Sequence, residues 1–159
     1  MSWTPVTFGR RHKGKTLPVI LLTDPDWFFW AWEEGAFQSR RELLPEAKIL
    51  HAKATSIKVP QRGTEHLQVQ CKFYSEGHTS VGFDLVATSE PLHHGSTPTL
   101  RDDFIDLSIP RREKGYDKLG YRLFLRSLKF HLFGNESKPM TRKLCEDFFD
   151  EENNFHRNR

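Results

Sequence analysis

Four cationic side chains lie close together near the N-terminus of this chain. Residues 10–15 include Arg10, Arg11, Lys13 and Lys15 and no acidic residue. Glycines at positions 9 and 14 let the backbone of this segment approach a ligand closely. Guanidinium and ammonium groups bind phosphate oxygens, and phosphate contacts dominate the affinity of proteins for nucleic acids. We therefore predict that these four residues contact the phosphates of DNA or RNA.

An aromatic segment follows shortly afterwards, and it includes Trp27 and Trp30. Flat rings beside positive charge suit nucleic acid, because bases stack on aromatic side chains while cations bind the backbone. We predict Trp27 and Trp30 as base-stacking residues. The alternative is core packing, because aromatic residues around most of a helix usually indicate burial on several sides.

The basic segment also matches the phosphate-loop pattern G-x-x-x-x-G-K-[ST] between Gly9 and Thr16. A working phosphate loop follows a buried strand and opens a long helix within a parallel sheet. Here only residues 3–8 precede the pattern, and Pro18 occupies a position where the helix should run. We therefore expect no nucleotide hydrolysis, no catalytic residue and no enzymatic activity.

A second basic surface is predicted on a helix over residues 114–133. Its cations recur at steps of four, four, four and three, which places them on one side of the helix. This basic ridge consists of Lys114, Lys118, Arg122, Arg126 and Lys129. The ridge could follow phosphates, or it could pair with the acidic residues of the last helix, which are Glu146, Asp147, Asp150 and Glu151. We expect the loop to be the binding site and the ridge to be mainly paired.

Metal and cofactor sites are not indicated. His93 and His94 are adjacent but have no second Cys or His pair at ligand spacing, and the other histidines are scattered. Cys71 and Cys145 fall on apolar faces and are predicted to be buried thiols. Two cysteines form no disulfide framework, so we expect a reduced, cytoplasmic protein without metal or cofactor.

Composition predicts a globular chain. It has 159 residues, a net charge of +3, 36% hydrophobic residues and 13% aromatic residues. A chain of this length forms one domain, predicted over residues 1–159, and its aromatic rings compensate for a low hydrophobic content. No apolar stretch is long enough to cross a bilayer, and the N-terminus lacks the order of a signal peptide.

The strongest structural signal is an alternation of apolar and polar residues. It covers residues 66–73 and 80–87, on both sides of a turn over 75–78, and predicts an antiparallel hairpin with one buried face. The fold class is therefore α+β: an antiparallel sheet of three to five strands, with this central hairpin, packed by three or four helices.

Prolines mark the predicted boundaries of several elements. Thr23 or Asp24 is expected to cap a helix that starts at Pro25 and ends at Gly35. Residues 37–54 are expected to be helical with a break at Pro45. Residues 88–102 are expected to form a loop, and a strand over 105–109 is expected to stop at Pro110.

Residues 5–37 carry a recognisable module. Phe8-Gly9, the basic loop with Gly14-Lys15-Thr16-Leu17, and Asp24-Pro25-Asp26-Trp27 with Trp30 resemble a small module found at the C-terminus of exonuclease-X-like proteins. The same module occurs in stand-alone bacterial and phage proteins of unknown function. Residues 38–159 resemble only uncharacterised bacterial proteins.

The resemblance implies association with DNA or RNA processing. The basic loop has one residue more between its glycines than the common form. Such nucleases open with Asp-x-Glu on their first strand, whereas here this spacing occurs only at residues 150–152. We therefore predict a non-enzymatic nucleic-acid-binding accessory protein of bacterial or phage origin. The alternative is a protein-interaction factor, an adaptor or inhibitor that acts on a host complex.

Overall fold

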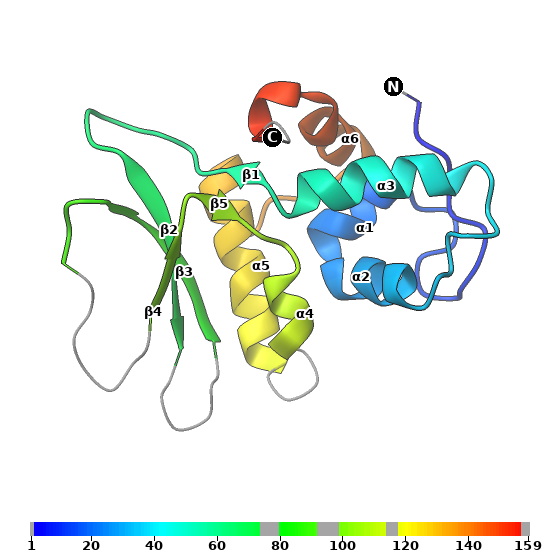
Figure 1. The fold of residues 1–159 in the computed structure, drawn as a ribbon, viewed down its shortest axis with the longest axis horizontal. Helices are drawn as coiled ribbons and strands as arrows, with labels where there is room; N and C mark the ends of the chain where they lie inside the picture. The colour runs from blue at the N-terminus through cyan, green and yellow to red at the C-terminus, as the bar shows by residue number, and fades with distance from the viewer. Residues whose placement is uncertain (1, 74–79, 92–98, 114–117, 157–159) are drawn as a thin grey trace. The chain divides into compact units, whose positions relative to one another are not determined.

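The computed structural model describes residues 2–73, 80–91, 99–113 and 118–156 (Figure 1). The chain packs as two compact units. Unit 1 consists of Met1–Ile57, Asp106–Arg111 and Pro139–Arg159, and unit 2 consists of Lys58–Ile105 and Arg112–Lys138. The α+β class predicted from the sequence is confirmed, with six α-helices in the described ranges rather than three or four.

Unit 1 is built around a short apolar helix, α1 (Leu17–Thr23), which contacts α2 (Pro25–Glu33), α3 (Leu43–Ala54) and α6 (Arg142–Asp150). A helix that is apolar all round is stable only when neighbours cover every side. Helix α1 is covered in this way, since Leu17, Ile20, Leu21 and Leu22 are fully buried. A 3₁₀ turn, η1 (Glu152–Asn154), follows α6.

The start and end of α2 agree with the prediction. Pro25 is its first residue, where the missing N–H costs nothing, and Asp24 occupies the N-cap position. Gly35 follows the C-cap with a φ of +72°, a left-handed conformation that favours glycine.

Unit 2 contains the predicted hairpin. Strands β2 (Leu67–Phe73) and β3 (Ser80–Ala87) pair antiparallel, with Val69 opposite Leu85 and Cys71 opposite Phe83. The predicted turn over 75–78 lies outside the described residues. The thiol of Cys71 is buried in this sheet, and the thiol of Cys145 is buried in unit 1.

A third strand, β4 (Thr99–Asp102), pairs with the other edge of β2 and gives the order β3-β2-β4. The expectation of a loop through residues 88–102 was therefore wrong for its last four residues. Two short strands, β1 (Ile57–Lys58) and β5 (Phe104–Ile105), form a second sheet.

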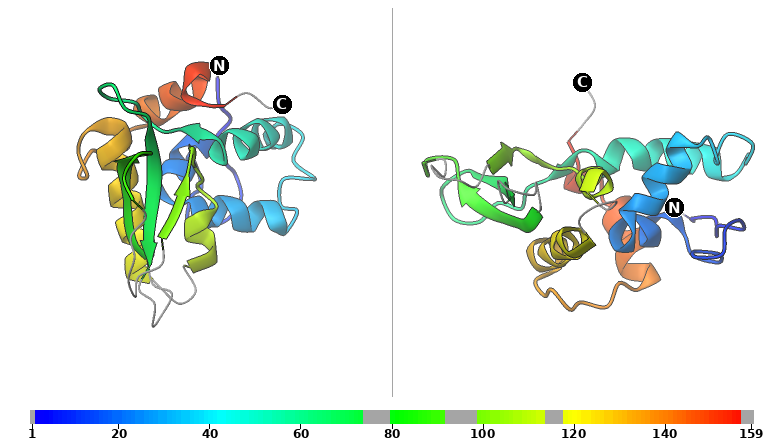
Figure 2. Two further views of the ribbon diagram at one scale, coloured as in Figure 1. Left: turned by 60° about the vertical axis from the view of Figure 1, so that its left-hand side comes forward. Right: turned by 90° about the horizontal axis from the view of Figure 1, so that it is seen from below.

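Helix α5 (Lys118–Phe133) packs against β3, and the left view of Figure 2 shows the yellow helix beside the green strands. The close approach depends on Gly82, whose φ is +90° and where an added Cβ would lie 2.6 Å from the Ser127 hydroxyl. That hydroxyl accepts a hydrogen bond from the backbone N–H of Phe83 at 3.2 Å. Residues 114–117 of the predicted helix lie outside the described residues. No helix in the described ranges is long and apolar enough to cross a bilayer.

Three prolines that we interpreted as breaks lie in the first turns of helices. Pro18 is in the first turn of α1, Pro45 is the third residue of α3, and Pro110 is the second residue of α4 (Ile109–Glu113). The first N–H groups of a helix have no intrahelical acceptor, so proline removes no hydrogen bond there.

Two predicted elements are corrected by these helix starts. Residues 34–42 form turns and irregular backbone, so the helix predicted over 37–44 is wrong except at its last two residues. The strand predicted over 105–109 ends at Ile105 because α4 begins at Ile109.

Candidate nucleic-acid interface

The basic loop, residues 9–15, is closed by two backbone hydrogen bonds. The N–H of Val6 donates to the carbonyl of Lys15, and the N–H of Gly14 donates to the carbonyl of Val6, both at 2.8 Å. Gly9 and Gly14 have φ values of +75° and +88°, so the loop uses the backbone freedom of glycine at both ends. The stem is therefore fixed, although these residues are not part of a strand.

Trp27 forms the floor beneath the loop. An added Cβ at Gly9 would lie 3.5 Å from its ring, and the ring centroids of Phe8 and His12 lie 5.5 and 5.4 Å from that of Trp27. Phe37 packs against Trp27 at 6.5 Å. Trp27 is only 8% exposed, so this predicted stacking residue supports the loop from within unit 1.

His12 holds the middle of the loop down. Its side chain is buried, its Nε2 lies 2.8 Å from Oδ2 of Asp24, and its Nδ1 lies 3.2 Å from Nζ of Lys15. A carboxylate only accepts hydrogen bonds and an ammonium only donates them. Nε2 therefore donates to Asp24 and Nδ1 accepts from Lys15, which is the arrangement of a neutral imidazole.

The electrostatics of His12 agree with this protonation state. Burial lowers the pKa of His12 below 6.5, and the neighbouring charges of Lys15 and Arg11 lower it further, against the opposing effect of Asp24. Sequence reasoning placed His12 among scattered histidines. The sequence did contain a signal for its burial, because His12 is the one residue of 10–13 that is neutral at pH 7.

The cations of the loop are displayed outward around this buried histidine. All four predicted residues, Arg10, Arg11, Lys13 and Lys15, are exposed. The guanidinium of Arg11 lies 3.4 Å from Asp24, yet its side chain is 61% exposed. Arg10 and Lys13 have no ion-pair partner among the described residues. The loop therefore presents four positive charges against one contacting carboxylate.

Acidic residues of α2 are paired within unit 1. Arg111 donates hydrogen bonds of 2.8 Å to both Asp26 and Glu33. The hydrogen bonds to Glu33 and Asp26 raise the pKa of the Arg111 guanidinium above its usual range. This fork neutralises two of the carboxylates closest in sequence to the loop.

Arg40 adds a cation that sequence reasoning missed. Its guanidinium carbon lies 3.8 Å from the centroid of the Phe8 ring, a cation–π contact, and it donates a hydrogen bond to the carbonyl of Ala36. The signal in the sequence was weak, because Arg40 lies in an irregular segment without periodicity.

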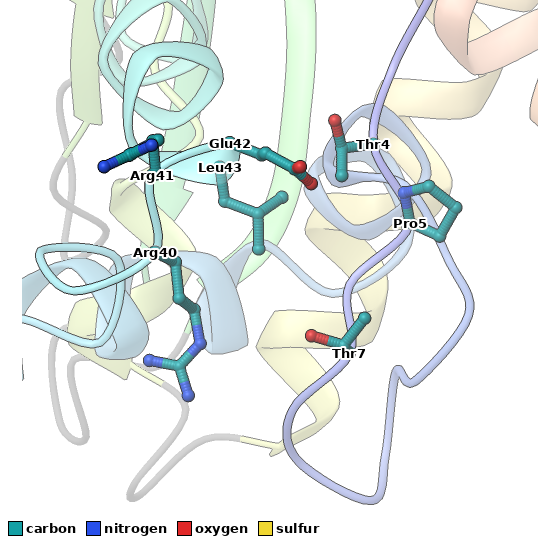
Figure 3. A pocket seen from close by; sticks show the side chains of 7 residues that line it. All are labelled: Thr4, Pro5, Thr7, Arg40, Arg41, Glu42 and Leu43. Atoms are coloured by element: carbon teal, nitrogen blue, oxygen red, sulfur yellow. The ribbon is translucent and has the colours of Figure 1, made fainter.

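A hollow of about 260 Å³ lies between residues 4–7 and residues 40–43 (Figure 3). The backbone N–H and the hydroxyl of Thr4 donate to the buried carboxylate of Glu46 at 3.0 and 2.5 Å, which fixes one wall. The walls carry both positive and negative side chains. This mixture does not select one class of ligand.

The phosphate-loop pattern is not matched by the surrounding elements. A helix does begin at Leu17, contrary to our expectation from Pro18, but α1 has only 7 residues and residues 2–7 form no strand. The Thr16 hydroxyl, which would hold a metal in such a loop, is buried and donates to Glu146 at 3.0 Å. Lys15 contacts His12. These side chains are thus engaged in the fold.

The basic ridge is exposed along α5. Lys118, Arg122 and Arg126 are exposed and Lys129 is half-buried, and none of the four forms an ion pair with a described residue. Lys114 lies outside the described residues.

The acidic residues of α6 have partners inside unit 1. Glu146 pairs with Arg142 at 2.8 Å and Asp147 pairs with Lys143 at 2.6 Å. Asp150 accepts a hydrogen bond from the indole of Trp3 at 3.1 Å. Helices α5 and α6 belong to different units, so pairing between the ridge and these acids stays a prediction.

Protein-family models, curated proteins and solved structures were compared with this chain, and none of them matches it. The resemblance of residues 5–37 to the exonuclease-X-like module therefore remains an expectation from the sequence.

Proposed function

We propose that unit 1 binds the phosphate backbone of DNA or RNA through the basic loop, and that the protein acts as a non-enzymatic accessory factor. The observation that carries this proposal is the division of the loop into a buried histidine and four exposed cations. His12 is held by Asp24 and Lys15, while Arg10 and Lys13 have no ion-pair partner in the described part of the chain.

A run of charged residues is usually just a solvated surface. The basic loop differs from such a surface in two respects. First, its backbone is fixed at both ends and in the middle, so little loop entropy is lost on binding. Second, Arg111 neutralises Asp26 and Glu33, which reduces the opposing field near the loop. Both features favour binding of a polyanion.

Counterion release provides the direct test. Binding of labelled oligonucleotides is measured over a salt series for the wild type and for the Arg10→Gln/Lys13→Gln variant. Each phosphate contact contributes about 0.9 to the slope of log affinity against log salt for a duplex and about 0.7 for a single strand. The double variant should therefore weaken binding and lower the slope by about 1.4–1.8.

The matched control is Arg122→Gln/Arg126→Gln, which removes the same charge from exposed positions of unit 2. The proposal expects a smaller loss from this control than from the loop variant. A flat salt dependence, no binding below about 100 μM, or normal binding by the loop variant would contradict the proposal. A loss confined to the control would make the ridge the binding surface.

A reduced, cytoplasmic location fits the same proposal. Both cysteines are buried thiols, as expected where disulfides do not form. The protein-interaction alternative would be supported instead if one stoichiometric partner were captured from extract after nuclease treatment, with no salt-dependent binding of nucleic acid.

A further inference from the structure

Trp30 is an exposed ring next to the floor of the basic loop. Its side chain is 43% exposed, whereas Trp27, one turn earlier on α2, is 8% exposed. The two indole centroids lie 6.3 Å apart. Trp27 in turn lies under Gly9 and beside His12. The exposed ring and the loop that carries the cations are therefore joined through one buried tryptophan.

The charges around Trp30 favour one direction for a bound strand. Glu34 is one helical turn beyond Trp30 and is exposed, while Trp27 and the loop lie one turn before it. Glu33 is already paired with Arg111. A polyanion that contacts Trp30 is therefore attracted toward the loop and repelled from the C-terminal end of α2.

Trp30 lies within a few nucleotide spacings of the basic loop. The ring centroids of His12 and Trp30 lie 5.4 and 6.3 Å from that of Trp27. Neighbouring nucleotides in a stacked strand are about 3.4 Å apart, so the whole separation between the rings of His12 and Trp30 is less than about four nucleotide spacings. Phosphates at the loop and a base at Trp30 can belong to the same short segment.

We propose that the site selects single-stranded nucleic acid, with an unpaired base stacked on Trp30 while the adjoining phosphates contact the basic loop. This inference rests on the proposed function and adds the strand class. In a duplex the faces of the bases are covered by their neighbours, so an exposed ring has nothing to stack on without unstacking a pair. In a single strand each base offers a face, and stacking on an aromatic side chain contributes to affinity without base selectivity.

The test compares Trp30→Ala, Trp30→Phe and wild type for binding to a labelled single strand, to a duplex of equal length and to a strand of abasic sites. All measurements use one salt concentration. The wild type should bind the single strand more tightly than the duplex. Trp30→Ala should weaken single-strand binding by about 5- to 150-fold, the range expected for one stacked base. Binding of duplex and abasic strand should not change.

Two control variants test whether the effect comes from stacking on the ring at position 30 rather than from the loss of any exposed apolar ring. Trp30→Phe keeps an aromatic face and should retain most of the affinity. Phe130→Ala removes a ring that is 50% exposed on α5 of unit 2 and should leave binding unchanged.

Equal loss of duplex and single-strand binding in Trp30→Ala, or no loss at all, overturns the single-strand inference. Those outcomes leave the phosphate-binding proposal intact, provided that binding still depends on salt and on Arg10 and Lys13. Absence of salt-dependent binding to all three ligands contradicts the proposed function itself.

Discussion

The contact between His12 and Asp24 can be tested by a double-mutant cycle. Asp24→Ala removes the acceptor of a buried imidazole N–H at 2.8 Å, and His12→Phe keeps a ring on Trp27 but removes both hydrogen bonds. The two changes together replace the polar pair by apolar groups.

The magnitude follows from the burial of the pair. A buried donor or acceptor left without its partner costs about 1–3 kcal/mol, and more when the remaining group is charged. The Arg11 contact adds little because Arg11 is 61% exposed. We expect each single substitution to lower the free energy of unfolding by about 2 kcal/mol. The double variant should lose about as much as one single variant, so the coupling energy is about 2 kcal/mol.

Urea denaturation followed by tryptophan fluorescence measures the free energy of unfolding of unit 1 for the wild type and each variant, and these values give the coupling energy. All four tryptophans of the chain lie between residues 3 and 32, within that unit. The single variants should also bind oligonucleotides less tightly, although Asp24→Ala removes no cation. If the two losses simply add, within about 0.5 kcal/mol, the pair does not hold the loop and the reasoning fails.

Two further predictions concern the ridge and three histidines that are buried or half-buried. In the wild type Arg122 and Arg126 repel each other and their ridge neighbours at spacings of three and four residues; Arg122→Glu/Arg126→Glu converts two of these repulsions to attractions. At about 0.2–0.5 kcal/mol per pair, this change within α5 alone would leave the stability unchanged or slightly raised. The predicted pairing of the ridge with the acids of α6 would instead be replaced by like-charge repulsion, so we expect thermal denaturation to show a loss of about 1–2 kcal/mol, and unchanged stability would contradict the pairing. Acidification should destabilise the protein, because burial lowers the pKa of His12, His51 and His131 below 6.5 and the unfolded chain then binds more protons. The contribution of these histidines to the free energy of unfolding is fully present above pH 6.5 and is lost as pH falls through their folded pKa values. His12→Gln, whose amide can both donate to Asp24 and accept from Lys15, should flatten this dependence in urea titrations at several pH values, and an unchanged dependence would contradict the role given to His12.

The hairpin of unit 2 could be predicted because its signal is local. Successive side chains of a strand point to opposite faces of the sheet, so a strand with one buried face is recognised from alternating apolar and polar residues alone. The residues that face inward, such as Cys71 and Phe83, are opposite each other in the sheet. Strand β4 carries only four residues and joins β2 from a distant part of the sequence. Such a short segment has too few residues for an alternation to be recognised.

Proline boundaries were predicted less well because the same residue has opposite meanings at different helix positions. Pro25 was placed correctly since an Asp precedes it. Pro18, Pro45 and Pro110 follow Leu, Leu and Ile, which are not capping residues, and so appeared to interrupt an element rather than to begin one. Whether a proline is at the start or in the interior depends on where the preceding residues pack, and that is tertiary information.

The Asp24 carboxylate can bind either the start of α2 or the side chain of His12, and the local sequence does not determine which of the two it binds. Its position before Pro25 predicts a side-chain cap for α2, yet its carboxylate makes no cap hydrogen bond. Pro25 has no N–H to satisfy, and the N–H of Trp27 donates to the backbone carbonyl of Asp24 at 3.1 Å. Because the first residues of α2 need no hydrogen bond from the Asp24 side chain, the carboxylate can accept a hydrogen bond from His12. The residue that the sequence assigned to the helix thus holds the loop, and substitution of Asp24 should affect binding at the loop more than the helicity of α2.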